Sequence, residues 1–174
     1  EHTALTAGIK NVVNNHSIIT GNSLPVLVDS GASEHYFDDL LAPGLRDKLS
    51  DYTILQVPRT ITTAGNHELK GVATGILSET IVDSKGVKQA VGLPIVVVPG
   101  LGRNLLSVPA ATARGVITTF AQQDSWIETG SFVIPLQQAG GAHDLYSFKI
   151  ELEPPDVGLH VKVSGTSDEW HRRM

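Results

Sequence analysis

From residue 24 onward, short apolar runs alternate with clusters of turn-forming residues along the chain. Runs of this length, rich in β-branched residues and bounded by Gly, Asn, Asp or Pro, are typical of β-strands. The pattern predicts strands in LPVLV, RTITT, HELKGVATGIL, ILSETIV, KQAVGLPIVVV, GVITTFA, SWIET, SFVIPLQ and DLYSFKIEL. We therefore expect about nine strands and an all-β fold, either a barrel or a sandwich.

Two turns predict hairpins, and one segment predicts a helix. Ala64-Gly65-Asn66 separates two strand-like runs, and Gly and Asn tolerate the positive φ that tight hairpins require. Asp83-Ser84-Lys85-Gly86 separates the next pair of runs. Residues 103–115, RNLLSVPAATARG, combine clustered Leu and Ala with a terminal Gly. We expect one short helix there, opened by the Arg-Asn-Leu-Leu sequence and with its proline in the first turns.

The composition changes at both ends of the chain. Residues 1–22 are small and polar with weak periodicity, and we interpret them as a linker or spacer. Residues 153–174 contain paired prolines near their start and are mostly polar, which predicts a second linker. One folded domain remains at residues 23–152, with no repeat of 20–50 residues, and a chain of 174 residues can bury a sizeable core.

The charge and cysteine content exclude several classes of protein. Lys and Arg number 13 against 18 Asp and Glu, and a net charge of −5 argues against a nucleic-acid-binding surface. Without any cysteine, the chain forms neither disulfides nor thiolate metal sites. No apolar run approaches the ~18–20 residues of a membrane span, and the N-terminus lacks a signal-type apolar segment. We expect a soluble, intracellular domain.

The strongest chemical signal is Asp29-Ser30-Gly31, placed directly after the apolar run PVLV. An aspartic protease needs a carboxylate at a rigid strand end, a glycine that lets another backbone approach, and a small hydroxyl that can hydrogen-bond across to a second copy. Two such carboxylates about 3 Å apart share one proton. One then activates a water while the other protonates the peptide carbonyl oxygen. Alone, the same three residues also fit an ordinary turn.

Two further features follow in sequence, a hairpin at residues 59–75 and PGLGRNLLSV at residues 99–108. Together with LVDSGASEHYF, TITTAGN, GSFVIPL and LYSFKI, they resemble the protease region of copia-type (pseudovirid) retrotransposon polyproteins, relatives of the retropepsins. The resemblance covers roughly residues 24–151. The closing EWHRRM is similar to the start of the integrase zinc region that follows the protease in such polyproteins.

The resemblance implies a retropepsin-like closed β-barrel with a flap hairpin and one short helix. It makes Asp29 the catalytic acid/base, assigns Ser30 an inter-subunit hydrogen bond, and places Gly31 along the substrate backbone. No metal or organic cofactor is implied.

It also implies two supporting groups of residues. Ala64, Gly65 and Asn66 would form the flap tip that covers the peptide and excludes water. Gly102, Arg103 and Asn104 would support the active site, with the arginine reaching beneath the active-site loop. Retroviral enzymes supply an Asp to that arginine, where this chain has Ser33 followed by Glu34.

The chain holds one half of such an active site. The sequences beginning at Asp83 and Asp124 both break the Asp-Ser-Gly motif. The enzyme is therefore expected to be a C2 homodimer that pairs Asp29 with its copy in the partner. By resemblance, it would cleave a Gag-Pol polyprotein, bound in an extended conformation, inside cytoplasmic virus-like particles, and it would bind neither nucleic acid nor membrane.

Other functions fit the residues less well. The same fold could serve as a catalytically silent module for dimerisation or peptide binding. Ser33, His35 and Asp38 are the residue types of a nucleophilic triad, but no Gly-x-Ser-x-Gly elbow is present. His35 with Asp38 and Asp39 could suggest metal ligands, and a solvated loop after the catalytic strand fits their spacing better. His171 lacks the partners of a zinc site.

Overall fold

The structure, a computed structural model, describes residues 23–139 and 145–153. The linker predicted at residues 1–22 lies outside the described residues, and so does all but the first residue of the linker predicted at 153–174.

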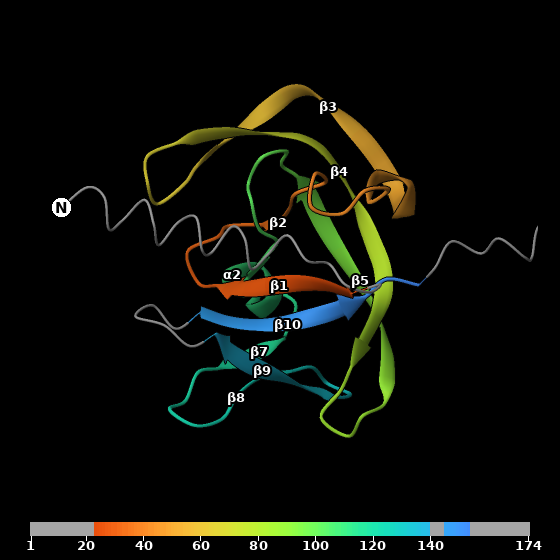
Figure 1. Cartoon of the computed structure of the whole chain (residues 1–174), viewed down its shortest axis with the longest axis vertical. Helices are drawn as coiled ribbons and strands as arrows, with labels where there is room; N and C mark the ends of the chain where they lie inside the picture. The colour runs from red at the N-terminus through yellow and green to blue at the C-terminus, as the bar shows by residue number, and fades with distance from the viewer. Residues whose placement is uncertain (1–22, 140–144, 154–174) are drawn as a thin grey trace, which may run out of the picture.

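Ten β-strands, one 3-10 turn and one short α-helix make up the described part of the chain (Figure 1). In chain order they are β1 (Ser23–Asp29), β2 (His35–Phe37), η1 (Arg46–Lys48), β3 (Leu49–Thr62), β4 (Glu68–Val82), β5 (Lys88–Val97), β6 (Leu105–Ser107), α2 (Val108–Thr112), β7 (Ile117–Thr119), β8 (Ser125–Glu128), β9 (Val133–Ala139) and β10 (Leu145–Glu151). The predicted all-β class is confirmed.

The strands are hydrogen-bonded in the order β3-β4-β5-β2-β6-β1-β10-β9-β8-β7. One further pairing, Glu151 with Thr80, brings the end of β10 back onto β4. The sheet therefore bends round on itself instead of lying flat, and β1 runs through its middle between β6 and β10.

The main core lies inside this curved sheet, and strand alternation supplies its side chains. In β1, Leu24, Val26 and Val28 are buried on one face. In β10, Phe148 and Ile150 are buried while the intervening Lys149 is exposed. Burying a side chain of this kind contributes about 1.5–3 kcal/mol, so the period-two pattern fixes which face of each strand turns inward.

Both predicted hairpins are confirmed. Between β3 and β4, the amide of Thr63 donates to the carbonyl of His67, and Asn66 adopts a φ of 59°. Between β4 and β5, one Asp83 carboxylate oxygen accepts hydrogen bonds from the amides of Lys85 and Val87. Asn66 tolerates the positive φ that the first turn requires, and Asp83 accepts the amide hydrogen bonds that close the second turn.

The helix predicted at residues 103–115 is only partly correct. The helix covers Val108–Thr112, with the proline in its first turn as predicted, whereas Leu105–Ser107 forms strand β6. Leu105 pairs with Leu27 of β1 and also with Tyr36 of β2. A short apolar run does not distinguish a strand from a helix by itself, and here two distant strands determine the outcome.

Within residues 23–139 and 145–153, no helix is both long and apolar enough to cross a membrane.

Candidate active site

Parallel pairing of β1 with β6 creates the edge at which the candidate site lies. Asp29 is the last residue of β1, and it is paired with Ser107, the last residue of β6. Parallel strands end at the same edge of a sheet. The loop after β1 and the start of α2 therefore both begin at the edge where Asp29 lies. Asp29 is thus carried on a central strand that has hydrogen-bonded neighbours on both sides.

The predicted catalytic residues form a tight local turn. The amide of Gly31 donates a 2.7 Å hydrogen bond to Oδ1 of Asp29. Asp29 is half-buried, while Ser30 and Gly31 are exposed. A Cβ on Gly31 would lie 3.3 Å from that same Oδ1, which is tighter than most such contacts. Among the described residues nothing hydrogen-bonds Oδ2, so one carboxylate oxygen is held and the other is available to a further group.

Ser107 fastens the loop that follows Asp29. Its side chain is fully buried, and its hydroxyl donates to the carbonyl of Ala32. The same oxygen accepts a 3.1 Å hydrogen bond from the amide of Ala110 and so caps α2. One serine therefore links the loop, strand β6 and the helix, and nothing in the sequence pattern marked it as different from any other serine.

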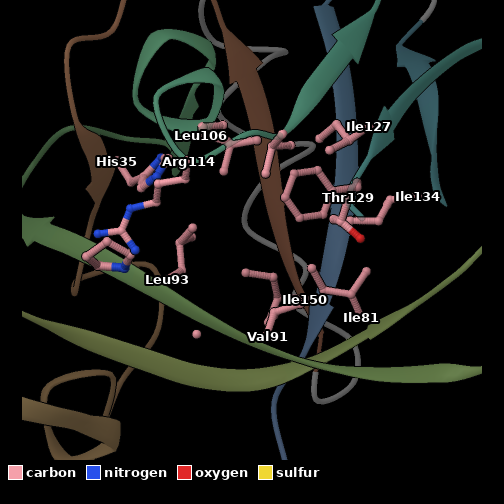
Figure 2. Close-up of a pocket in the computed structure, with 15 residues that line it drawn as sticks. His35, Ile81, Val91, Leu93, Leu106, Arg114, Ile127, Thr129, Ile134 and Ile150 are labelled. Atoms are coloured by element: carbon pink, nitrogen blue, oxygen red, sulfur yellow. The ribbon is translucent and has the colours of Figure 1, made fainter. Parts of the chain in front are cut away.

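His35 does not lie in a solvated loop as predicted, because it is a buried residue of β2, the strand between β5 and β6. Its Nδ1 accepts a 3.0 Å hydrogen bond from the amide of Ser107. Burial lowers the pKa of the imidazole to about 4, and the nearby Arg114 (Figure 2) acts in the same direction while Glu34 opposes it. The ring is therefore neutral above mildly acid pH, with its proton on Nε2.

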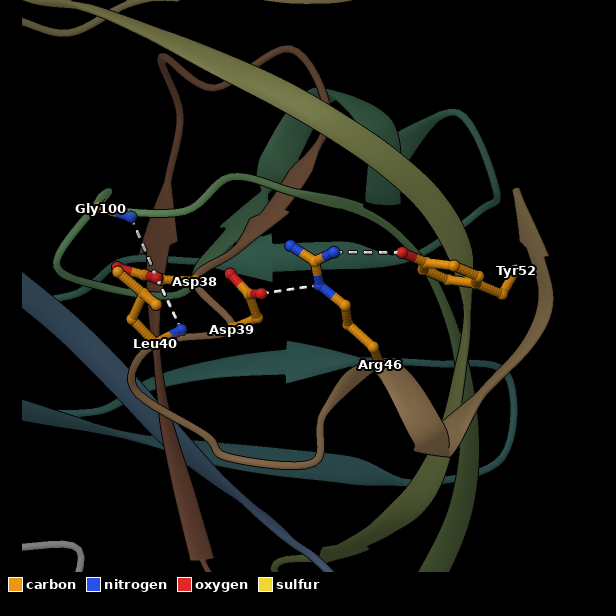
Figure 3. A network of polar contacts seen from close by, with 6 residues as sticks. All are labelled: Asp38, Asp39, Leu40, Arg46, Tyr52 and Gly100. Atoms are coloured by element: carbon orange, nitrogen blue, oxygen red, sulfur yellow. Dashed lines mark hydrogen bonds and ion pairs between the residues drawn. The ribbon is translucent and has the colours of Figure 1, made fainter. Parts of the chain in front are cut away.

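Asp38, which was expected in a solvated loop, is likewise buried, with 1% of its surface exposed (Figure 3). Its Oδ1 accepts from the amides of Leu40, at 2.9 Å, and Gly100, at 3.2 Å, while its Oδ2 accepts from Gly102 at 2.7 Å. Gly100 and Gly102 have φ values of 82° and 77°, which aim their amides at the carboxylate. Asp38 thus holds the loop that leads into β6.

Asp39, the next residue, forms an ion pair instead of binding backbone amides. Asp39 pairs with Arg46 at 2.7 Å, and the same guanidinium contacts the hydroxyl of Tyr52 (Figure 3). The three candidate metal ligands after the catalytic strand therefore have separate protein partners. Across residues 23–139 and 145–153, no cluster of three His, Cys, Asp or Glu side chains is arranged to hold a metal ion.

Of the three predicted support residues, Asn104 makes the most contacts. It is 2% exposed; its Oδ1 accepts from the amide of Asp38 at 3.0 Å, and its Nδ2 donates to the carbonyl of Pro25 at 3.2 Å. Arg103 is exposed, and it has no ion pair or side-chain hydrogen bond with any described residue. The contact expected beneath the active-site loop is therefore not formed within the described chain, and the side-chain amide of Asn104 instead connects β1 with the segment that follows β2.

The predicted flap residues Ala64, Gly65 and Asn66 form the exposed turn of the β3–β4 hairpin. In Figure 1 this turn and the C-terminal end of β1 lie toward the same side of the molecule. The stem of the hairpin is joined to the loop after Asp29 by an ion pair between Arg59 and Glu34.

An apolar contact makes the same connection. Ile61 and Leu69, one from each strand of the hairpin, pack against a small buried cluster formed by Ala32, Tyr36, Val96 and Val98. The hairpin and the segment that follows Asp29 therefore belong to one packed unit.

Comparison with known proteins adds no assignment, since no family model and no curated protein matches this sequence. The chemistry of the site rests on its geometry: one carboxylate with one restrained oxygen, at the end of a central strand, next to a hairpin that is tied to the same loop.

Proposed function

We propose that the protein is an aspartic endopeptidase of the retropepsin type, in which Asp29 from each of two subunits activates a water molecule. The observation that carries the proposal is the position of Asp29 at the end of β1, opposite Ser107 and hydrogen-bonded to the amide of Gly31. The return of β10 to β4 supports a closed barrel around this strand.

The proposed mechanism needs a second carboxylate, and a twofold axis beside Asp29 supplies one. Two carboxylates at about 3 Å share a single proton. The ionised one takes a proton from water, whose oxygen attacks the peptide carbonyl carbon, and the protonated one gives its proton to the carbonyl oxygen. Collapse of the intermediate breaks the C–N bond: the amine leaves with the proton taken from water, and one hydroxyl of the intermediate returns its proton to the other carboxylate, which leaves a carboxylic acid. The amide of Gly31 keeps Oδ1 oriented throughout.

The hairpin supports an extended peptide as the substrate. A strand-like peptide can form main-chain hydrogen bonds with the loop after Asp29 on one side and with the β3–β4 turn on the other. The partly buried Ile61, Leu69 and Leu101 near this loop favour apolar side chains beside the cleaved bond. The sequence resemblance to copia-type proteases supports a Gag-Pol precursor as the natural substrate, cleaved in cytoplasmic virus-like particles.

The test is cleavage of a mixed library of unstructured peptides between pH 4 and 7, read by mass spectrometry. We expect the wild-type protein to cut, and Asp29→Asn to lose at least about a hundredfold in rate because the carboxylate acts as acid and base. Asp124→Asn is the matched control, since Asp124 also precedes a serine but is exposed and lies outside the site.

A statine-containing peptide should abolish cleavage. Cutting that survives in Asp29→Asn, or that ignores the statine peptide, would overturn the proposal. A wild-type dimer that binds peptides without cutting any of them would instead identify the protein as a silent module.

A further inference from the structure

A second site is suggested by an apolar cavity of about 210 Å³ between the region of α2 and strands β4, β5, β8, β9 and β10 (Figure 2). Neither Asp29 nor the β3–β4 turn contributes to it. Six buried apolar side chains form much of its wall: Ile81, Leu106, Ile127, Ile134, Phe148 and Ile150.

This cavity is larger than the voids left inside a packed core, and the exposed Arg114 places one end of it near the surface. Cores are packed so closely that few voids exceed the size of one water molecule. An apolar cavity of roughly 150 Å³ can stay free of water and bind benzene. The larger space found here accommodates an apolar body of about six to eight carbon atoms.

One end of the cavity is polar, and it is positively charged. His35 and Arg114 lie together at that end in Figure 2, away from Ile134 and Thr129. Because Nδ1 of His35 accepts the amide of Ser107, Nε2 carries the proton and can donate. No Asp or Glu is among the lining residues.

The charge of Arg114 is not neutralised within the described part of the chain, where the residue forms no ion pair. Glu34, the acidic residue that acts on His35, is already paired with Arg59. A guanidinium and an imidazole N–H that line the same end of a cavity can both hydrogen-bond a carboxylate bound there.

We propose that this cavity binds a small amphipathic monocarboxylate, with its carboxylate at Arg114 and His35 and its apolar tail among the isoleucines. The apolar wall provides affinity and the charged end provides the preference for an acid over an alcohol of the same length. This site is independent of peptide cleavage, so its test does not depend on whether the proposed function is correct.

The probe is octanoate, titrated into the purified chain of residues 1–174 and followed by NMR of isoleucine methyl groups and of the Ser107 amide. We expect saturable shifts of Ile127, Ile134 and Ile150, together with the Ser107 amide, which reports on His35 through their hydrogen bond. 1-Octanol, equal in length and uncharged, should bind at least about tenfold more weakly.

Two variants separate the charge from the cavity. Arg114→Gln, an exposed position that tolerates the change, should weaken octanoate by about tenfold and leave octanol unchanged. Lys149→Gln is the control, because Lys149 lies on β10 between two lining residues and is itself exposed. It should alter neither affinity.

Three results would overturn the proposal: no saturable shift below the micelle concentration of octanoate, equal affinity for octanoate and octanol, or unchanged octanoate binding in Arg114→Gln. Thermal unfolding of both variants verifies that each is folded when it is titrated.

Discussion

Ser107 lies directly opposite Asp29 in the parallel pairing of β1 and β6, and its buried hydroxyl holds the carbonyl of Ala32 in the loop that follows Asp29. Ser107→Ala removes this donor and the cap of α2, so we expect the free energy of unfolding to fall by about 1–3 kcal/mol. Urea unfolding at pH 7 measures the change. Ser131→Ala, at an exposed position, should alter it by less than about 0.5 kcal/mol. An equal effect of the two substitutions would show that the hydroxyl does not fasten the loop.

His35 should make stability depend on pH. Burial lowers the pKa of its imidazole from 6.5 to about 4, so between these values the unfolded chain binds more protons than the folded one. The contribution is complete above pH 6.5 and is lost as the pH falls to 4, a change on the order of 2–3 kcal/mol.

The variant His35→Asn tests this dependence, since asparagine can still accept the amide of Ser107 but does not titrate. The difference in unfolding free energy between the variant and the wild type should shrink as the pH falls from 6.5 to 4, because only the wild type loses the histidine contribution. A difference in unfolding free energy that stays constant between pH 6.5 and 4 would show that His35 is not the source of the pH dependence.

The ion pair between Arg59 and Glu34 should restrain the β3–β4 hairpin more than it stabilises the fold. Both side chains are 44% exposed, so their coupling in a double-mutant cycle should be below about 1 kcal/mol and should vanish in high salt. Hydrogen exchange of amides in residues 60–70 should nevertheless accelerate in Arg59→Gln and in Glu34→Gln. Lys88→Gln breaks a distant exposed pair with Glu151 and should leave that exchange unchanged. Unaltered exchange in all three variants would exclude a restraining role.

Gly71 should be required for the hairpin to pack against β5. A Cβ at this position would lie 2.7 Å from Cγ1 of Val96, a buried and rotationally stiff side chain. Gly71→Ala should therefore cost about 1–3 kcal/mol of unfolding free energy. At Gly92 on β5 the nearest such atom is 3.8 Å away, so Gly92→Ala should be neutral or slightly stabilising. Chemical denaturation compares the two, and a harmless Gly71→Ala would disprove the close approach.

The sequence predicted the features that depend on local patterns. The alternation of apolar and polar residues in β1 and β10 involves only neighbouring positions, and it predicts the all-β fold class. Turn residues such as Gly65 and Asp83 are equally local, and they predict both hairpins. Leu105 and Leu106 were placed in a helix because pairing with β1 and β2, about 70–80 residues away, is not visible in a local run.

The same distance explains what was missed at the candidate site. His35 is buried because β2 lies between β5 and β6, and its partner Ser107 is 72 residues further along the chain. Asp38 contacts Gly102 across 64 residues. A hydrophilic residue after a strand normally predicts a solvated loop, and only the folded sheet supplies the amides that make its burial favourable.

The central claim is that each active site takes one Asp29 from each of two subunits. Wild-type and Asp29→Asn chains, mixed at constant total concentration and allowed to exchange subunits, test it through the rate of peptide cleavage. If both carboxylates are required, a mixture of equal parts retains about one quarter of the wild-type rate, because only that fraction of dimers has two wild-type subunits. Retention of about three quarters would show that one Asp29 per dimer suffices, and about one half would show that each subunit acts alone; either result would contradict the shared site.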